Sequence, residues 1–403
     1  MEELARRYLG LVVRMARHRP DLLEAFAGPD ELSEAVAGEA LTPLSELHDE
    51  ALRIEADANE APAISDPERR RARWLALQAA ALAASARVLQ GEEIGLPDLV
   101  ESLCDLAAER TPEPELIAAH RLLDAALPPG ASLRARLAAH RGAMAVPPEH
   151  VPAAVEALAE LLRERAASDL GLPDDESLAF EPVHAAGEAW HVRAHPERPL
   201  RTRLELNLST PWSVDEIVRA AGGEAYPGGH AARTIREATS GRTHPELLAW
   251  IRPAPEASIR AGIGAVGREV ILGDFELAAE LRRIGRQLGL RWEPERALEV
   301  GRARGRLAAA VANATLLLHH DGLPASEVQA YLAEIALLEP DAADRVMSLL
   351  ADPLRSVEPF ARAHAPGLVR EWLSLTGQTD GLRRLMVEPL TPGQLRAEAG
   401  VTA

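Results

Sequence analysis

The stretch Gly222-Gly223-Glu224-Ala225-Tyr226-Pro227-Gly228-Gly229-His230 decides how the rest of this chain is interpreted. A zinc-hydrolase helix carries two imidazole ligands one or two turns apart, with a glutamate beside the first that acts as general base. Glu224 stands where that base would stand. The first-ligand position is Gly223, which has no donor atom. The stretch therefore has the outline of a metal site but not its ligands.

The segments on either side of this stretch predict a strand and two helices. In Arg201–Leu208 leucines alternate with polar residues, which is typical of a half-buried strand. Thr210-Pro211 predicts a helix start, with Thr210 as N-cap and Pro211 at the first helical position. That helix is expected to end at Ala221, where the glycines begin. A second helix is expected from His230 to about Ala238. Each interior glycine disfavours a helix by about 1 kcal/mol relative to alanine, so an irregular backbone is expected between them.

The rest of the chain predicts a mainly α fold. Residues 1–175 show helix after helix, with prolines at the helix starts. Between 177 and 208 the periodicity changes to two, and a hairpin of Leu178–Val183 with Trp190–Arg193 is expected. Helical spacing returns after His230. We expect a large helical body with one small antiparallel sheet beside a central cleft. Its regions are an N-terminal helical part, 1–175, and a part carrying the sheet and the motif, 176–403, within one continuous fold.

Further helices are expected after the motif, and the prediction includes several long ones. The expected helical ranges are Pro245–Ile251, Glu256–Leu272, Asp274–Leu288, Pro294–His319, Pro324–Leu337, Asp341–Leu350, Ser356–Thr376 and Asp380–Val387. The glycines at 262, 264 and 267 follow no strand, so helix packing explains them better than a nucleotide-binding loop does.

Composition excludes several classes of function. Aromatic residues make up 3% of the 403 residues and the formal net charge is −18, so neither a base-stacking platform nor attraction to phosphate is available. The sequence contains no lysine, which excludes Schiff-base and P-loop lysine chemistry. Cys104 is the one cysteine, so no intramolecular disulfide is expected. The charged N-terminal segment predicts neither a signal peptide nor a membrane span, and a cytoplasmic location is expected.

At the central stretch the chain resembles a known family. Glu224-Ala225-Tyr226-Pro227-Gly228, followed after one residue by His230, is similar to the motif His-Glu-Ala-Tyr-Pro-Gly-His-His. This motif belongs to the bacterial domain-of-unknown-function family numbered eight hundred and eighty-five, which resembles the helical glutamate-ligand zincins such as carboxypeptidase Taq and angiotensin-converting enzyme. Further similar segments are Tyr8–Pro29, Leu122–Pro128, Leu206–Pro211, Asn313–His319, Trp372–Gln378 and Leu390–Leu395.

The resemblance implies which residues would have formed the site. The family's first histidine falls on Gly223, its glutamate on Glu224, its second histidine on Gly229 and its third on His230. The segment that supplies the carboxylate ligand falls on Arg260–Gly264, with Ala261 at the glutamate position. A late aromatic segment that supplies a transition-state tyrosine falls on Phe360-Ala361-Arg362. The family is expected to use zinc, but all three ligand positions here lack donor atoms, so no cofactor is expected.

These observations predict a catalytically degenerate zinc-metallopeptidase-like protein. It would bind a peptide or small molecule in a residual cleft, with Tyr226, Asn207, Arg260 and Arg362 as lining candidates, and the strand 201–208 could offer an edge to an extended peptide. One alternative is a hydrolase that uses Glu224 and His230 in a rearranged site. Another is a purely structural or interaction subunit. A glutamate such as Glu224 is more often a salt-bridged or solvated carboxylate than a catalytic base, and a histidine such as His230 is more often a hydrogen-bonded core residue than a ligand. Neither a nucleic acid nor a membrane is expected as partner, and the sequence leaves the oligomeric state open.

Overall fold

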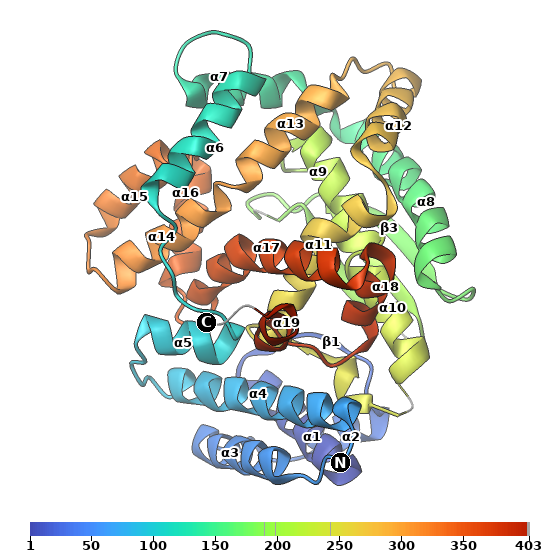
Figure 1. Cartoon of the computed structure of the whole chain (residues 1–403), viewed down its shortest axis with the longest axis vertical. Helices are drawn as coiled ribbons and strands as arrows, with labels where there is room; N and C mark the ends of the chain where they lie inside the picture. The colour runs from blue at the N-terminus through green and yellow to red at the C-terminus, as the bar shows by residue number, and fades with distance from the viewer. Residues whose placement is uncertain (189, 198, 242, 401–403) are drawn as a thin grey trace. The chain divides into compact units, whose positions relative to one another are not determined.

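The computed structural model describes residues 1–188, 190–197, 199–241 and 243–400. The chain is mainly helical, with small sheets (Figure 1). Residue contacts divide it into two compact units. Unit 1 comprises Met1–Glu109, Ile235–Gly262 and Leu350–Ala403, and unit 2 comprises Arg110–Thr234 and Ile263–Leu349. Both units are thus built from segments that are distant in sequence, whereas the expected regions follow chain order. That expected division stays a prediction.

Unit 1 is built around the N-terminal helices. Helix α1 packs on α3, and α3 packs on α4, whose first turn is closed by a capping box between Ser65 and Glu68. Tyr8 and Trp74 are fully buried there and meet edge to face. Strands β1 (Leu23–Phe26) and β7 (Ala249–Ile251) pair antiparallel. The helices that lie wholly in this unit are α1 (Glu2–His18), α2 (Asp30–Ala37), α3 (Leu44–Glu60), α4 (Asp66–Leu89), α5 (Leu96–Cys104), α17 (Glu358–Thr376), α18 (Gln378–Val387) and α19 (Pro392–Ala399).

Unit 2 carries the central stretch. Helix α13 packs on α6, around a cluster of leucines and alanines that includes Leu123, Leu137 and Leu307. Helix α8 packs against α9 and α12. The helices that lie wholly in unit 2 are α6 (Glu113–Ala126), α7 (Leu133–Ala143), α8 (Val151–Leu170), α9 (Val214–Arg219), α12 (Asp274–Gln287), α13 (Pro294–Gly305), α14 (Ala308–His319) and α15 (Ala325–Glu334). Three further helices, α10 (Gly229–Ser240), α11 (Pro255–Ile271) and α16 (Pro340–Ala351), each contain a boundary between the units.

The three-stranded sheet of unit 2 has the order β3-β5-β4, so the expected hairpin is wrong. Strand β5 (Arg201–Asn207) lies between β3 (Ser177–Val183), to which it is parallel, and β4 (Val192–Glu197), to which it is antiparallel. The physical reason is burial. Leu204 and Leu206 are fully buried on β5, whereas β3 and β4 are half-buried at most. The most deeply buried strand lies at the centre of the sheet, so the predicted edge strand is not an edge.

The helix before the glycines begins three residues later than predicted. Trp212-Ser213 form strand β6, which pairs with β2 (Ala145–Val146), and α9 begins at Val214 with Ser213 as N-cap. The Glu216 carboxylate accepts hydrogen bonds from the Ser213 backbone N–H, at 2.9 Å, and from its hydroxyl. Thr210 instead donates its hydroxyl to the Asn207 carbonyl at 2.9 Å. Local sequence favours a helix start at Thr210-Pro211, but pairing with β2 keeps Trp212-Ser213 extended, so the helix begins only after them.

Most predicted helices are confirmed, and three ranges differ from the prediction. The predicted helix Asp274–Leu288 is confirmed to within one residue, as α12. The predicted helix 294–319 is two helices, with a break at Arg306-Leu307. The predicted helix 245–251 is a short 3₁₀ turn followed by β7, because the Ala249–Ile251 backbone pairs with β1. Helix α7 was not expected. Among the described residues, none of the helices has the length and apolar character needed to span a bilayer.

Candidate functional site

The glycine-rich stretch forms one wide helical turn between α9 and α10. Residues Ala220–Ala225 are π-helical, and the Tyr226 N–H reaches back five residues to the Ala221 carbonyl at 2.9 Å. The next bond runs from the Gly228 N–H to the Gly222 carbonyl, at 3.0 Å. The irregular backbone expected here is confirmed. A π turn inside a helical segment is often found at functional sites.

The glycines of this turn allow backbones to approach closely. A Cβ at Gly228 would lie 1.8 Å from the Gly223 carbonyl oxygen, so no other residue fits without a backbone shift. A Cβ at Gly223 would lie 3.2 Å from the carbonyl oxygen of Gly264 on α11. At Gly229 it would lie 3.1 Å from the Glu224 carbonyl oxygen. Both positions at which the resemblance places histidines are therefore packed against backbone, and the packing role expected of Gly264 is confirmed.

Glu224 lies at the surface of unit 2. Its side chain is 39% exposed, and Arg219 Nη1 lies 3.7 Å from its carboxylate. An ion pair this exposed contributes about 1 kcal/mol at most. Glu224 is thus placed as a solvated, ion-paired carboxylate.

His230 is buried and fully hydrogen-bonded. Its Nε2 lies 2.6 Å from Glu176 Oε2, and its Nδ1 lies 2.7 Å from the Thr202 hydroxyl. Because a carboxylate can only accept, Nε2 carries the proton. Thr202 also accepts a bond from Arg233 at 2.8 Å, so its hydroxyl proton points to Nδ1. Burial lowers the pKa of His230, and the Glu176 carboxylate opposes this only in part. The interpretation as a hydrogen-bonded core histidine agrees with this geometry.

Glu176 organises this cluster, and sequence reasoning missed it. Its carboxylate accepts from His230, from the Tyr226 hydroxyl at 2.9 Å and from Arg163 Nε at 2.5 Å. Burial opposes ionisation of Glu176, but these three hydrogen bonds outweigh it and lower the pKa of the carboxyl. Burial, together with the Glu176 charge, raises the pKa of Tyr226. Glu176 ends the acidic run Asp174-Asp175-Glu176, and such runs usually face solvent, so the sequence did not indicate that this glutamate is buried.

The remaining candidates have other partners. Asn207 is buried, and its amide binds backbone groups of residues 185, 190 and 209, which fixes the connection between β3 and β4. Arg260, Ala261 and Arg362 belong to unit 1. There Arg260 donates to Glu24 at 2.5 Å and lies over the Trp250 ring, while Arg362 is mostly exposed near Glu358. Phe360 is fully buried.

The donor set of the described residues does not fit a metal. No group of three or more His, Cys, Asp or Glu side chains is arranged to hold an ion in that part of the chain. Glu176 and His230 form one pair, but each nitrogen of His230 already has a hydrogen-bond partner. Zinc sites in proteins use three or four such ligands. A tightly held zinc would therefore need donors other than these.

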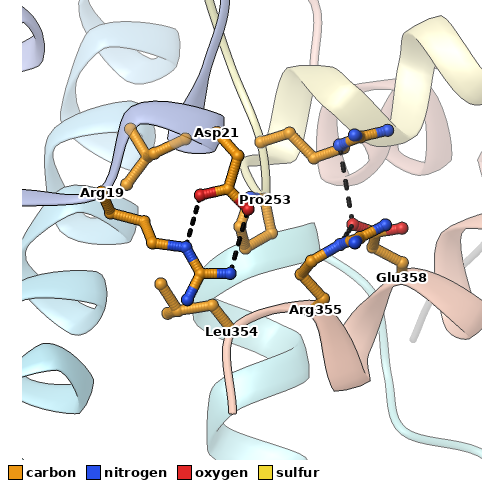
Figure 2. A pocket seen from close by; sticks show the side chains of 8 residues that line it. Arg19, Asp21, Pro253, Leu354, Arg355 and Glu358 are labelled. Carbon is orange, nitrogen blue, oxygen red and sulfur yellow. Dashed lines mark hydrogen bonds and ion pairs between the residues drawn. The ribbon is translucent and has the colours of Figure 1, made fainter. Parts of the chain in front are cut away.

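Unit 1 contains a second candidate, a small pocket (Figure 2). Its cavity volume is about 10 Å³, which is room for about one water molecule. Three arginines, two carboxylates and three apolar residues line it, namely Arg19, Arg252, Arg355, Asp21, Glu358, Leu22, Pro253 and Leu354. Figure 2 shows Arg19 and Asp21 on one side and Arg355 and Glu358 on the other. The lining residues come from three distant parts of the sequence, so no local sequence motif could predict the pocket.

Comparison of the chain with models of known protein families, with curated proteins and with solved structures found no match. The resemblance to a zincin-like family therefore rests on the quoted motifs alone. The class that fold and site define is a mainly helical protein with small sheets, a buried Glu–His–Tyr cluster and an arginine-lined pocket.

Proposed function

We propose that this chain is a metallopeptidase-like protein that no longer forms a metal centre and that acts by binding instead of by hydrolysis. One observation carries the proposal. At the first-ligand position, Gly223, a Cβ would lie only 3.2 Å from the Gly264 carbonyl oxygen, so a side chain there would need the neighbouring backbone to shift by a few tenths of an ångström. The donor losses at Gly229 and Ala261 support it as well. The proposed ligand is a peptide or small molecule held in what remains of the family's cleft.

The metal content of the purified protein tests this proposal. Protein prepared without chelator, dialysed and measured by elemental analysis should contain far less than one zinc per chain. One tightly held zinc per chain would contradict the proposal. His230→Gln would then show whether His230 is one of its ligands.

The strongest rival is a hydrolase that uses Glu224 and His230. Its difficulty is geometric, because the Glu224 carboxylate is half-exposed whereas both ring nitrogens of His230 are occupied inside unit 2. The rival predicts that Glu224→Gln abolishes cleavage of some peptide or ester. Glu276→Gln is a matched control, since Glu276 is also an exposed, arginine-paired carboxylate of unit 2.

A broad peptide and ester library separates the two functions. We expect no turnover by the wild-type protein. Cleavage that is retained in Glu276→Gln and lost in Glu224→Gln would establish the hydrolase. A purely structural subunit is favoured if the same library gives neither cleavage nor binding, and the dense glycine packing at Gly223 and Gly228 is compatible with that role.

An extended peptide has two strands to pair with in unit 2. Because β5 is central, the edges of the sheet are β3 and β4. Backbone pairing at such an edge supplies affinity, and alternate side chains supply specificity. We therefore propose β3 or β4, and not β5 as the sequence suggested, as the strand that pairs with a peptide.

A further inference from the structure

Helix α6 of unit 2 packs on α13 with one face and turns the opposite face to solvent (Figure 1). Its buried residues Leu116, Ala119 and Leu123 recur at helical spacing. A second row, on the exposed side, has the same spacing and consists of Pro114, Ile117, Ala118, Arg121, Leu122 and Ala125. From this second row we infer that two copies of the chain form a symmetric dimer, in which α6 packs antiparallel on α6 of the other copy.

The exposed row is apolar where a solvent-facing helix surface is usually polar. Arg121 is its one charged member. The two large apolar side chains stand well out of the protein, since Ile117 is 40% exposed and Leu122 is 44% exposed. Covering such side chains removes apolar surface from water, which favours association. Helix α6 is therefore apolar on both sides, and α13 covers only one of them.

The order of residues along α6 suits a two-fold contact centred on Ala118. Its small side chain allows two helix backbones to approach closely, and packed helices lie about 8–10 Å apart. Pro114 lies four residues before Ala118 and Leu122 lies four residues after it. An antiparallel two-fold therefore places Leu122 of each copy toward Pro114 of the other. A two-fold interface uses the same surface on both copies, so one self-complementary helix face is sufficient.

The charges beside the exposed row favour a second copy as the occupant. Glu115 lies three residues before Ala118 and Arg121 lies three residues after it, and both are exposed. In the part of the chain that the structure describes, neither side chain has an ion-pair or hydrogen-bond partner. Six residues apart, they are not neighbours within one helix. The two-fold brings Arg121 of each copy toward Glu115 of the other, so two opposite-charge pairs form.

The expected dimer is weak. Helix α6 has 14 residues and is thus about 21 Å long, so a single helix pair buries less than the roughly 1,200 Å² of a standard interface. Each copy also carries a formal net charge of −18, which opposes association at long range. We expect a Kd of about 0.1 mM at physiological ionic strength. The contact uses no residue of the glycine-rich turn, so it can fail while the proposed function stands, and the reverse also holds.

Sedimentation equilibrium of the full chain, from about 0.02 to 0.5 mM, tests the inference by charge reversal. Arg121→Glu should weaken the dimer by about tenfold or more, because it places two pairs of like charges across the two-fold. Glu115→Arg should weaken it similarly. The double variant restores opposite charges and should recover most of the wild-type affinity. Thermal melts establish that each variant is folded.

Two exposed residues of neighbouring helices give matched controls. Arg286→Glu on α12 and Glu299→Arg on α13 change the net charge by the same amounts but lie outside the exposed row of α6. Both should leave the Kd nearly unchanged. A wild-type protein that stays monomeric up to about 0.5 mM would overturn the inference. So would an Arg121→Glu dimer as tight as that of Arg286→Glu. A double variant that stays as weak as either single variant would show that α6 contacts some surface other than itself, and would overturn it too.

Discussion

At the scale of single residues, the glycines of the central turn differ in what surrounds them. A Cβ at Gly228 would lie 1.8 Å from a backbone oxygen, and at Gly223 it would lie 3.2 Å from one. At Gly142 of α7, nothing lies within 4 Å. Helix propensity alone would favour alanine at each helical position by about 1 kcal/mol. When alanine replaces each glycine, the gain in helix propensity is therefore opposed by a steric cost that is largest at Gly228, smaller at Gly223 and absent at Gly142.

Alanine substitution at these three glycines should follow the contact distances. Gly228→Ala should lose about 3 kcal/mol of unfolding free energy, because the backbone of the turn must move. Gly223→Ala should be near neutral, and Gly142→Ala should be neutral or gain up to about 1 kcal/mol. Urea denaturation of the three variants measures the order. If Gly228→Ala is as stable as Gly142→Ala, the close approach is wrong.

The Glu176–His230 pair should make stability depend on pH. The pKa of His230 is lowered in the folded state, so the unfolded chain takes up the proton first and stability falls as the pH drops below about 6.5. The pKa of Glu176 is also lowered, so more stability is lost below about 4.5. His230→Gln should flatten the dependence between pH 7 and pH 5.5 in urea titrations. His184→Gln, at an exposed histidine, is the control, and an unchanged slope in His230→Gln would contradict the assignment.

At the scale of elements, the sheet depends on a buried amide. Asn207 ends β5 and uses both ends of its side chain on backbone groups of the β3–β4 connection. The sequence suggested that Asn207 lines a cleft, whereas the structure gives it a structural role in the sheet. The two roles predict different effects of substitution.

Asn207→Asp should destabilise the protein by about 2 kcal/mol at pH 7, because a carboxylate would face the carbonyl oxygens of Ala185 and Trp190. The loss should shrink at low pH, where the carboxyl is protonated. Asn59→Asp, on the exposed face of α3, is the control and should change little. Unchanged stability together with altered ligand binding would restore the cleft-lining role.

At the scale of the whole molecule, each unit is made of segments distant in sequence. Unit 1 needs residues 350–403, which contribute fully buried Phe360 and Trp372. A fragment of residues 1–175 would hold only parts of both units.

That fragment should not fold cooperatively. We expect helical signal by circular dichroism but no sigmoidal thermal transition, because much of the buried surface of each unit is missing. The full chain is the control. A sharp, reversible transition of the fragment would support the division at residue 175 that the sequence suggested.

The sequence by itself determined the helices and the chemistry that is excluded. Proline starts and apolar spacing predicted the succession of helices in residues 1–175, to which α4 and α6 belong, because these preferences act within a few residues. That Gly223, Gly229 and Ala261 have no side-chain donor atom is a covalent fact that needs no structure. Only the tertiary structure decided that β5 is central, that Glu176 holds His230 from 54 residues away, and that Arg19 and Arg355 share a pocket. Such partners are chosen by burial and packing across the fold, and no local pattern records that choice.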